Sequence, residues 1–126
     1  MDKTNLANIL DEQWRRSTFK TWPFESHKKC NANKMAEAGF IFIGSSVEPD
    51  STICFFCSKS LDGWEANDDP WSEHLKHSPQ CEYAQMQKSP QDWTLGEFLS
   101  IVERYESRLI DKEIDKWENR LQKFFN

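Results

Sequence analysis

Residues 54–57 read CFFC, and His74 and then Cys81 follow them along the chain. This spacing decides the fold. Two cysteines separated by two residues at a strand turn bind one side of a metal ion with little strain, and a histidine on a helix and a later cysteine complete a tetrahedron. Such a ligand set leaves no open position for water, which is typical of structural rather than catalytic zinc. We therefore predict one structural Zn2+ bound by Cys54, Cys57, His74 and Cys81.

The other interpretations of these cysteines are unrelated buried thiols or, in a secreted chain, disulfides. The first residues, MDKTN, lack the basic and apolar pattern of a secretory signal, so we expect reduced thiols, among which clustered cysteines are metal ligands. Cys30 lies outside the spacing and is interpreted as a free thiol. A nucleophilic pair of Cys30 and His27 would lack an oxyanion site and an orienting third group. The chain is therefore predicted not to be an enzyme.

The composition of the chain argues against some classes of binding partner. The chain has 126 residues, 29% of them charged, and a net charge of -5. Its mean hydropathy is -0.82, and no apolar run approaches the ~20 residues of a membrane-spanning helix. We expect a soluble intracellular protein that binds no membrane. Proteins that bind nucleic acid through its phosphates usually carry a basic face, so we expect no direct nucleic-acid binding and favour basic peptides as ligands.

Hydrophobic periodicity and turn residues predict a mixture of short helices and strands before residue 90. A first helix should run from a Thr4 cap through Leu6 to Trp14. A second should start at an Asn31 cap and stop at Gly39. An Asp-Pro pair announces the helix that carries His74, with Asp69 acting as its cap. Strands are expected at 40–43, 52–56 and 59–64.

The chain changes character after Pro90. From Thr94 to Phe125 there is no proline, and the only glycine is Gly96. The apolar residues recur with a period near 3.6, which predicts one amphipathic helix roughly 45 to 50 Å long. That length exceeds the diameter of the preceding domain, so the chain itself cannot cover the whole apolar stripe. We predict two parts, 1–89 and 90–126.

Several further motifs resemble those of the BIR (baculoviral inhibitor-of-apoptosis repeat) family. The resemblance covers about residues 15 to 85. It implies an α+β fold in which a small zinc-binding domain has a three-stranded antiparallel sheet with short helices. With one BIR domain and every ligand used by one zinc, no RING is expected, so intrinsic ubiquitin ligase activity is excluded. The matching motifs are Arg15-x-x-Thr18-Phe19, Trp22-Pro23, 35-MAEAGF-40, 54-CFFC-57, 61-LDGW-64, 68-DDPW-71 and Glu73-His74.

BIR domains bind a free N-terminus, usually beginning with alanine, along the edge of the third strand. The residue types at the matching positions suit that task. Leu61 and Trp64 can wall a small pocket for an alanine methyl group. Asp62 and Asp68 can accept charge-assisted hydrogen bonds from an α-ammonium group.

The segment 94-TLGEFL-99, leading into the long helix, resembles the single-BIR chromosomal passenger type of this family. That type reads a histone tail beginning Ala-Arg-Thr and phosphorylated on the threonine. The positions that match its phosphate contacts are Lys59 and His77, and a nearby phosphate would favour the protonated histidine. Family members that prefer caspase-derived or mitochondrial tetrapeptides often have tryptophan at the position of His77. The chain departs from the passenger type at Asp62, where glutamate is common.

The same resemblance implies partners for the long helix. It would form a bundle with borealin-like and inner-centromere-protein-like helices and so localise Aurora B kinase indirectly. A homodimer through Leu95 and Phe98 stays an open alternative, because Ala7 and Pro90 replace aromatic residues of that type. The residues predicted for the helix-bundle interface are Val102, Tyr105, Leu109, Trp117 and Leu121.

These inferences combine into one functional hypothesis and one rival. The hypothesis is a non-enzymatic adaptor that joins a phosphorylated histone tail to a kinase scaffold in mitosis and cytokinesis. Its expected location is the nucleus, on chromosomes and the centromere, then the spindle midzone, and also the cytoplasm. The rival is an anti-apoptotic inhibitor that binds caspases or their antagonist peptides starting with alanine.

Overall fold

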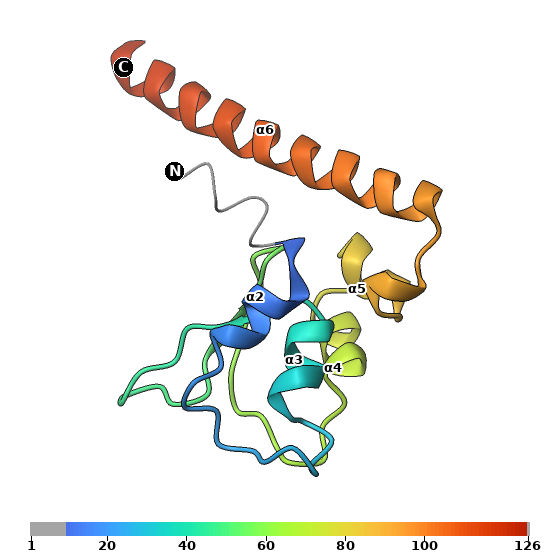
Figure 1. Cartoon of the computed structure of the whole chain (residues 1–126). Helices are drawn as coiled ribbons and strands as arrows, with labels where there is room; N and C mark the ends of the chain where they lie inside the picture. The colour runs from blue at the N-terminus through green and yellow to red at the C-terminus, as the bar shows by residue number, and fades with distance from the viewer. Residues whose placement is uncertain (1–9, 126) are drawn as a thin grey trace. The chain divides into compact units, whose positions relative to one another are not determined.

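The computed structural model describes residues 10–125 and shows the α+β fold expected from the sequence (Figure 1). The chain forms two compact units, the first ending at Asp92 and the second beginning at Trp93. Among the described residues, no helix combines the length and the apolar character needed to cross a lipid bilayer. The expected helix from Thr4 through Leu6 to Trp14 lies largely outside the described residues.

The short helices of the first unit begin at polar side chains that accept a backbone hydrogen bond from the first turn. Asp11, Asn31 and Asp69 do this for three helices, and the sulfur of Cys81 does it for a fourth. Each cap satisfies one of the N–H groups that a helix start leaves without a partner. The helices are α2 (Glu12–Ser17), α3 (Ala32–Glu37), α4 (Pro70–His77), α5 (Glu82–Met86) and the 3-10 turn η1 (Pro90–Asp92).

Two of the predicted helices are confirmed with their boundary residues. The side chain of Asn31 accepts from the backbone of Lys34, and Gly39 follows α3 with a φ of 100°. A side chain at Gly39 would also meet the ring of Tyr83 at 3.0 Å, so the position needs glycine for conformation and for space. Asp69 caps α4 as expected. Helices α5 and η1 were not predicted.

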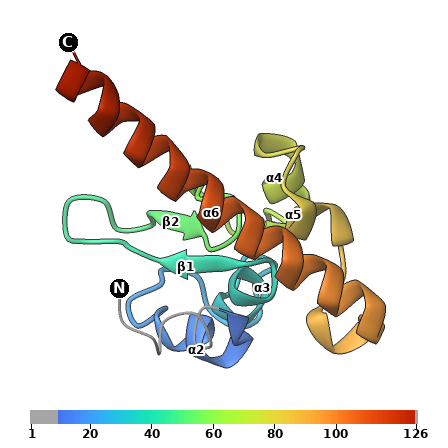
Figure 2. The same cartoon turned by 90° about the horizontal axis from the view of Figure 1, so that it is seen from above.

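The sheet has three antiparallel strands in the order β1-β2-β3, of which β1 and β2 are seen side by side in Figure 2. They are β1 (Phe40–Phe42), β2 (Thr52–Cys54) and β3 (Ser60–Leu61). Phe40 lies opposite Cys54, and Thr52 lies opposite Leu61. All three are shorter than predicted. The chain leaves β2 to form the CFFC turn, and Gly63 adopts a left-handed φ of 70°, which takes the chain out of the ladder after Leu61.

A buried arginine joins the helices to the metal-binding end of the first unit. Arg15 is fully buried. Its Nε donates to the carbonyl of Ala36 at 3.0 Å, and its Nη2 donates to the hydroxyl of Tyr83 at 3.1 Å. The guanidinium lies 4.7 Å from the ring centroid of Phe55, within the range of a cation–π contact. The Tyr83 hydroxyl donates in turn to the carbonyl of Glu37 at 2.7 Å.

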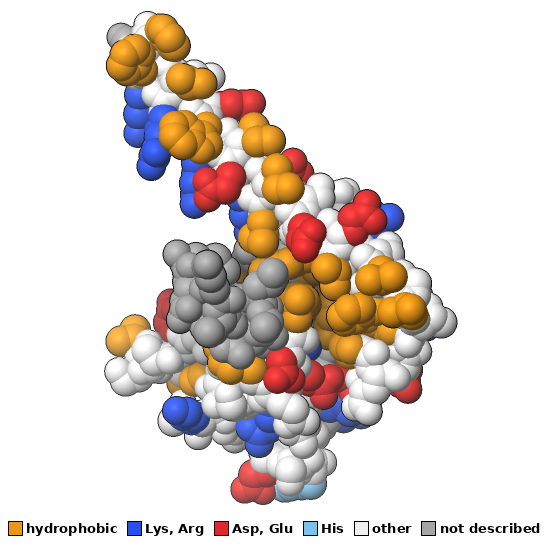
Figure 3. Space-filling model, turned by 45° about the horizontal axis from the view of Figure 1, so that its top comes forward, with side chains coloured by type: hydrophobic (Ala, Val, Ile, Leu, Met, Phe, Trp, Pro, Cys, Tyr) orange, Lys and Arg blue, Asp and Glu red, His pale blue; other side chains and the backbone are white. Residues whose placement is uncertain are grey.

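The second unit is dominated by α6 (Leu95–Phe125), a helix of 31 residues and thus about 46 Å long. It begins with a reciprocal cap. The backbone N–H of Thr94 donates to Glu97, whose own N–H donates to the Thr94 hydroxyl. Exposed apolar side chains continue along the helix (Figure 3). They recur at alternating steps of four and three residues, namely Ile110, Ile114, Trp117, Leu121 and Phe124.

Candidate zinc centre and peptide groove

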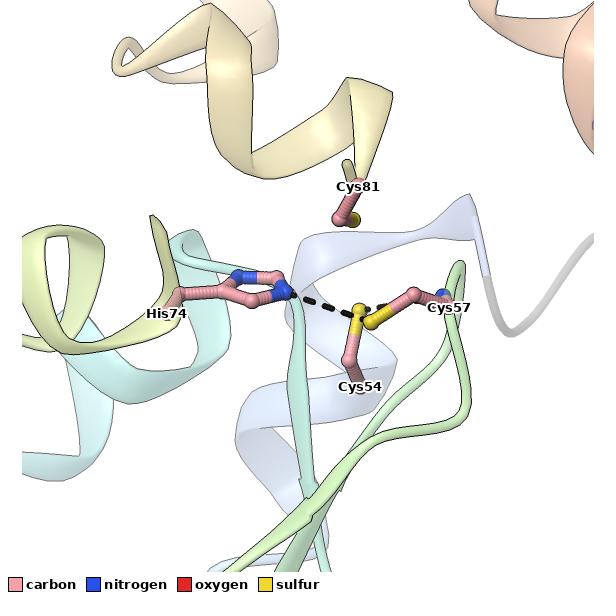
Figure 4. A group of neighbouring side chains, drawn as sticks. All are labelled: Cys54, Cys57, His74 and Cys81. Carbon is pink, nitrogen blue, oxygen red and sulfur yellow. Dashed lines mark hydrogen bonds between the residues drawn. The ribbon is translucent and has the colours of Figure 1, made fainter. Parts of the chain in front are cut away.

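Four metal-ligating side chains converge in the first unit (Figure 4). Cys54 ends β2, Cys57 closes the turn after it, His74 comes from α4, and Cys81 precedes α5. Their ligand atoms all lie within 4.8 Å of one another. The structure therefore brings together the four residues that the spacing predicted, from three different parts of the chain.

The histidine is held in the orientation that a metal ligand requires. Nδ1 of His74 donates to the carbonyl of Ala38 at 2.7 Å. This fixes the neutral ring as the tautomer whose Nε2 lone pair faces the cysteines. Nε2 lies 3.7 Å from the sulfur of Cys57. Neighbouring ligands of a tetrahedral zinc lie roughly 3.5 to 3.8 Å apart, given the usual zinc–ligand lengths.

Hydrogen bonds to its sulfur favour the thiolate form of Cys57, whereas the pKa values of the Cys54 and Cys81 thiols are raised. The N–H of Phe56 donates to the sulfur of Cys54 at 3.2 Å, and the hydroxyl of Ser78 donates to the sulfur of Cys57 at 3.2 Å. The side chains of Cys54 and Cys81 donate to Cys57 and, with smaller contributions from His74 and Ser78, lower its pKa. Burial, by contrast, raises the pKa of Cys54.

The donor set, its spacing and the histidine tautomer together fit Zn2+. Cys54, Cys57, His74 and Cys81 would hold the ion. When bound, the ion supplies a cross-link between β2, α4 and the start of α5. The contacts from Ala38 and Ser78 were not predicted, because a backbone carbonyl and a lone serine carry no sequence signal for a role beside a metal.

Cys30 stays apart from this cluster. Its side chain is fully buried, and its sulfur lies 3.8 Å from that of Met35. Burial, assisted by Asp68 and other acidic residues, raises the pKa of Cys30 to about 12. The thiol is therefore protonated at neutral pH and poorly suited to be a nucleophile. His27 is exposed and lies 3.3 Å from the carboxylate of Glu25.

A groove of about 580 Å³ lies beside β3 and α4. All six residues predicted to bind a peptide line it: Lys59, Leu61, Asp62, Trp64, Asp68 and His77. Ser51, Ser60, Gly63, Glu65 and Glu73 line it as well and were not predicted. Glu73 could have been predicted from the sequence, because it precedes His77 by one helical turn. Its carboxylate lies 3.4 Å from Nε2 of His77.

The polar residues of the groove differ in burial and in hydrogen bonding. Asp68 is half-buried and accepts a hydrogen bond from the N–H of Glu65 at 2.8 Å. Asp62, Lys59 and His77 are exposed, so their charged ends can reach a ligand. The groove thus has one half-buried, hydrogen-bonded carboxylate, that of Asp68, and exposed charges around it.

Trp64 belongs to the groove and to the core at once. Only 7% of its surface is exposed. Its ring meets Phe40 edge-on at a centroid distance of 5.2 Å and Trp22 at 6.4 Å. The exposed edge is the part that can touch a ligand, and the rest is fixed by aromatic packing.

The residues predicted on α6 differ in exposure. Trp117 and Leu121 are exposed, as are Leu95 and Phe98. Val102 and Leu109 are half-buried, and Tyr105 is buried. The exposed stripe from Ile110 to Phe124 therefore starts one residue after Leu109, and Leu95, Phe98 and Leu99 are a separate exposed group at the start of α6.

Comparison with known proteins finds a matching family and similar relatives. Residues 15–85 match the family model described as "BIR: Inhibitor of Apoptosis domain". Baculoviral IAP repeat-containing protein 5.1 of Xenopus tropicalis is 36% identical, over 97% of this chain and 83% of its own length. Baculoviral IAP repeat-containing protein 5 of Mus musculus is 40% identical, over 88% and 79%. A crystal structure of DIAP1 BIR1 bound to a Grim peptide has a TM-score of 0.49 and 32% identity, covering 57% of this chain and 68% of that one.

Proposed function

The chain belongs to the BIR-domain inhibitor-of-apoptosis family, in the group of Baculoviral IAP repeat-containing protein 5 (survivin), and from this premise we propose that it is a non-enzymatic adaptor. Its groove would bind a histone tail that begins Ala-Arg-phosphoThr. Its long helix would bind borealin-like and inner-centromere-protein-like helices and so place Aurora B kinase. We propose that it acts in the nucleus on chromosomes and the centromere, then at the spindle midzone, with a cytoplasmic pool.

The observation that carries this proposal is the mixture of charges around one groove. Asp62 and Asp68 offer acceptors for an α-ammonium group beside the apolar wall of Leu61. Lys59 and His77 offer donors on the same groove. A ligand that fits must be cationic at its first residue and anionic a short distance further on, as an Ala-Arg-phosphoThr tail is.

Peptide titration tests the proposal. The peptide Ala-Arg-phosphoThr-Lys should bind the zinc-loaded protein about ten-fold or more tightly than its unphosphorylated form, because a hydrogen bond to a charged group contributes roughly 1.5–3 kcal/mol. Lys59→Ala should remove most of that preference, whereas Lys20→Ala, at an exposed lysine outside the groove, should leave it unchanged. Acetylating the peptide N-terminus should abolish binding of both forms. Isothermal titration calorimetry measures all of these affinities.

Equal affinity for the two peptides, together with no effect of Lys59→Ala, would contradict the histone assignment. Tighter binding of an unphosphorylated tetrapeptide starting with alanine would favour the rival. The protein would then be an anti-apoptotic inhibitor acting on caspases or on their antagonists.

The exposed stripe of α6 supports the proposed helical partners. Alternating steps of four and three residues form the narrow apolar seam of a coiled coil. Co-expression with the two scaffold partners should yield a complex that survives purification. Leu121→Asp should prevent copurification because it places a charge in the seam, whereas Asn119→Asp, at an exposed position between seam residues, should not. If neither the unsubstituted chain nor Asn119→Asp copurifies with the two partners, the passenger assignment is contradicted. The homodimer through Leu95 and Phe98 would then be the alternative to test.

A further inference from the structure

We propose that Asp50 and Thr52, which lie behind the groove and do not line it, are positioning residues that hold its Leu61–Trp64 wall in the shape that accepts a peptide N-terminus. The inference rests on the proposed peptide-binding function. It assigns to Asp50, before β2, and to Thr52, the first residue of β2, a role in affinity that the groove residues alone do not reveal.

The Leu61–Trp64 wall needs support because the sheet ends at Leu61, the first residue of the wall. Strand β3 contains only Ser60 and Leu61, so the next three residues have no place in the ladder. Gly63 has a left-handed φ of 70°, and no atom beyond Gly63 and its two chain neighbours lies within 4 Å of the place where its side chain would be. Neither strand pairing nor packing around that glycine therefore fixes the turn between Leu61 and Trp64.

Asp50 supplies a backbone tether at the far end of this turn. Its Oδ2 accepts the main-chain N–H of Trp64 at 2.9 Å. A carboxylate acceptor makes a stronger hydrogen bond than a neutral one, and Asp50 is half-buried, where water competes less. This bond takes the place of the ladder hydrogen bond that Trp64 lacks.

Thr52 connects both ends of the wall. It is fully buried and lies opposite Leu61 in the β2–β3 register. Its hydroxyl donates to the carbonyl of Leu61 at 3.0 Å and accepts from Nε1 of Trp64 at 3.3 Å. One hydroxyl thus fixes the backbone at the start of the turn and the ring orientation at its end.

The three hydrogen bonds of Asp50 and Thr52 set the distance and angle between Leu61 and Trp64, which flank the pocket proposed for the alanine methyl group. Neither Asp50 nor Thr52 is among the residues that line the groove, so Asp50 acts through Trp64, and Thr52 acts through Leu61 and Trp64. Fixing a site before its ligand arrives reduces the ordering cost of binding. Loss of either tether should therefore weaken binding without removing a single peptide contact.

The test compares substitutions that remove or keep each hydrogen bond. Asp50→Ala should weaken binding of an Ala-starting peptide about ten-fold and accelerate amide hydrogen exchange of Trp64 by a similar factor. Asp50→Asn keeps an acceptor and should restore most of both. Thr52→Val should shift the indole N–H resonance of Trp64 and weaken binding, and Thr52→Ser should restore both. Glu48→Ala makes the same charge change at an exposed position of the same loop and should alter neither property.

Each outcome bears on the proposal. Unchanged affinity and unchanged Trp64 exchange in zinc-loaded Asp50→Ala would overturn the role of Asp50. If Asp50→Ala does not retain zinc, the comparison of Thr52→Val with Thr52→Ser tests the proposal instead. Equal peptide affinities of these two variants would overturn the positioning role. If the unsubstituted protein binds no Ala-starting peptide, the proposed function fails, while the exchange and indole measurements still decide whether the wall is tethered.

Discussion

Removing the metal from this protein is expected to unfold its first unit. The three strands contain only eight residues between them, and the helices before α6 are short, so little local structure is stable by itself. Structural zinc sites contribute about 10–16 kcal/mol of apparent binding energy at neutral pH, which exceeds the net stability of a typical small domain. Chelation should abolish the near-UV circular dichroism of the buried aromatic residues, and zinc should restore it. Metal analysis should find one zinc per chain.

A cysteine pair provides the matched control for this prediction. Cys57→Ser should lose zinc and the folded state, because a serine hydroxyl stays protonated and cannot replace a thiolate. Cys30→Ala removes a cysteine that is fully buried, whereas Cys57 is half-buried, and that lies outside the cluster. It should keep full zinc content and lose only the stability that a small buried side chain contributes, roughly 1 kcal/mol. Zinc retention by Cys57→Ser with an unchanged thermal midpoint would contradict the ligand assignment.

Substitution of Arg15 should give the second large effect. Arg15→Ala leaves a buried cavity and removes the donors to the Ala36 carbonyl and to the Tyr83 hydroxyl. We expect a loss of about 3 kcal/mol or more from the free energy of unfolding, which combines unsatisfied buried groups with the cavity. For a domain of this size that lowers the thermal midpoint by more than about 10 °C. Denaturant unfolding of the zinc-loaded protein measures the loss directly.

Two comparisons make the arginine prediction specific. Arg15→Lys keeps the charge and should recover only part of the loss, since an ammonium group cannot reproduce the planar fork of donors. Arg16→Ala changes the neighbouring arginine, which is less buried and donates to the side chain of Asn33 at 2.6 Å. It should cost less than about 1 kcal/mol. Similar losses at the two positions would show that the Arg15 contacts contribute little.

The sequence predicted those parts of the molecule that depend on spacing or on local chemistry. The metal ligands followed from the CFFC spacing, the limits of α3 followed from Asn31 and Gly39, and the start of α4 followed from Asp69. The groove residues came from resemblance to a family, and the structure places them on one surface without showing what they bind.

The parts that were missed depend on tertiary contacts. No local pattern shows that Ala38 accepts a hydrogen bond from His74, because its carbonyl is part of the backbone. Strand β2 was predicted too long because β-propensity continues through Phe55 and Phe56, while the chain turns there between the ligands Cys54 and Cys57. Helix α5 is only five residues long, and its cap is a cysteine sulfur, which is not among the usual capping residues.

The double role of Trp64 has an evolutionary consequence. A ring that contacts Phe40 and Trp22 inside the molecule cannot be exchanged without disturbing the core, so selection on folding keeps it whatever the ligand. Lys59, Asp62 and His77 are exposed and bear no such constraint. Divergence in ligand preference among related domains should therefore accumulate at these three positions, while the tryptophan and its supports persist in lineages that have changed partners.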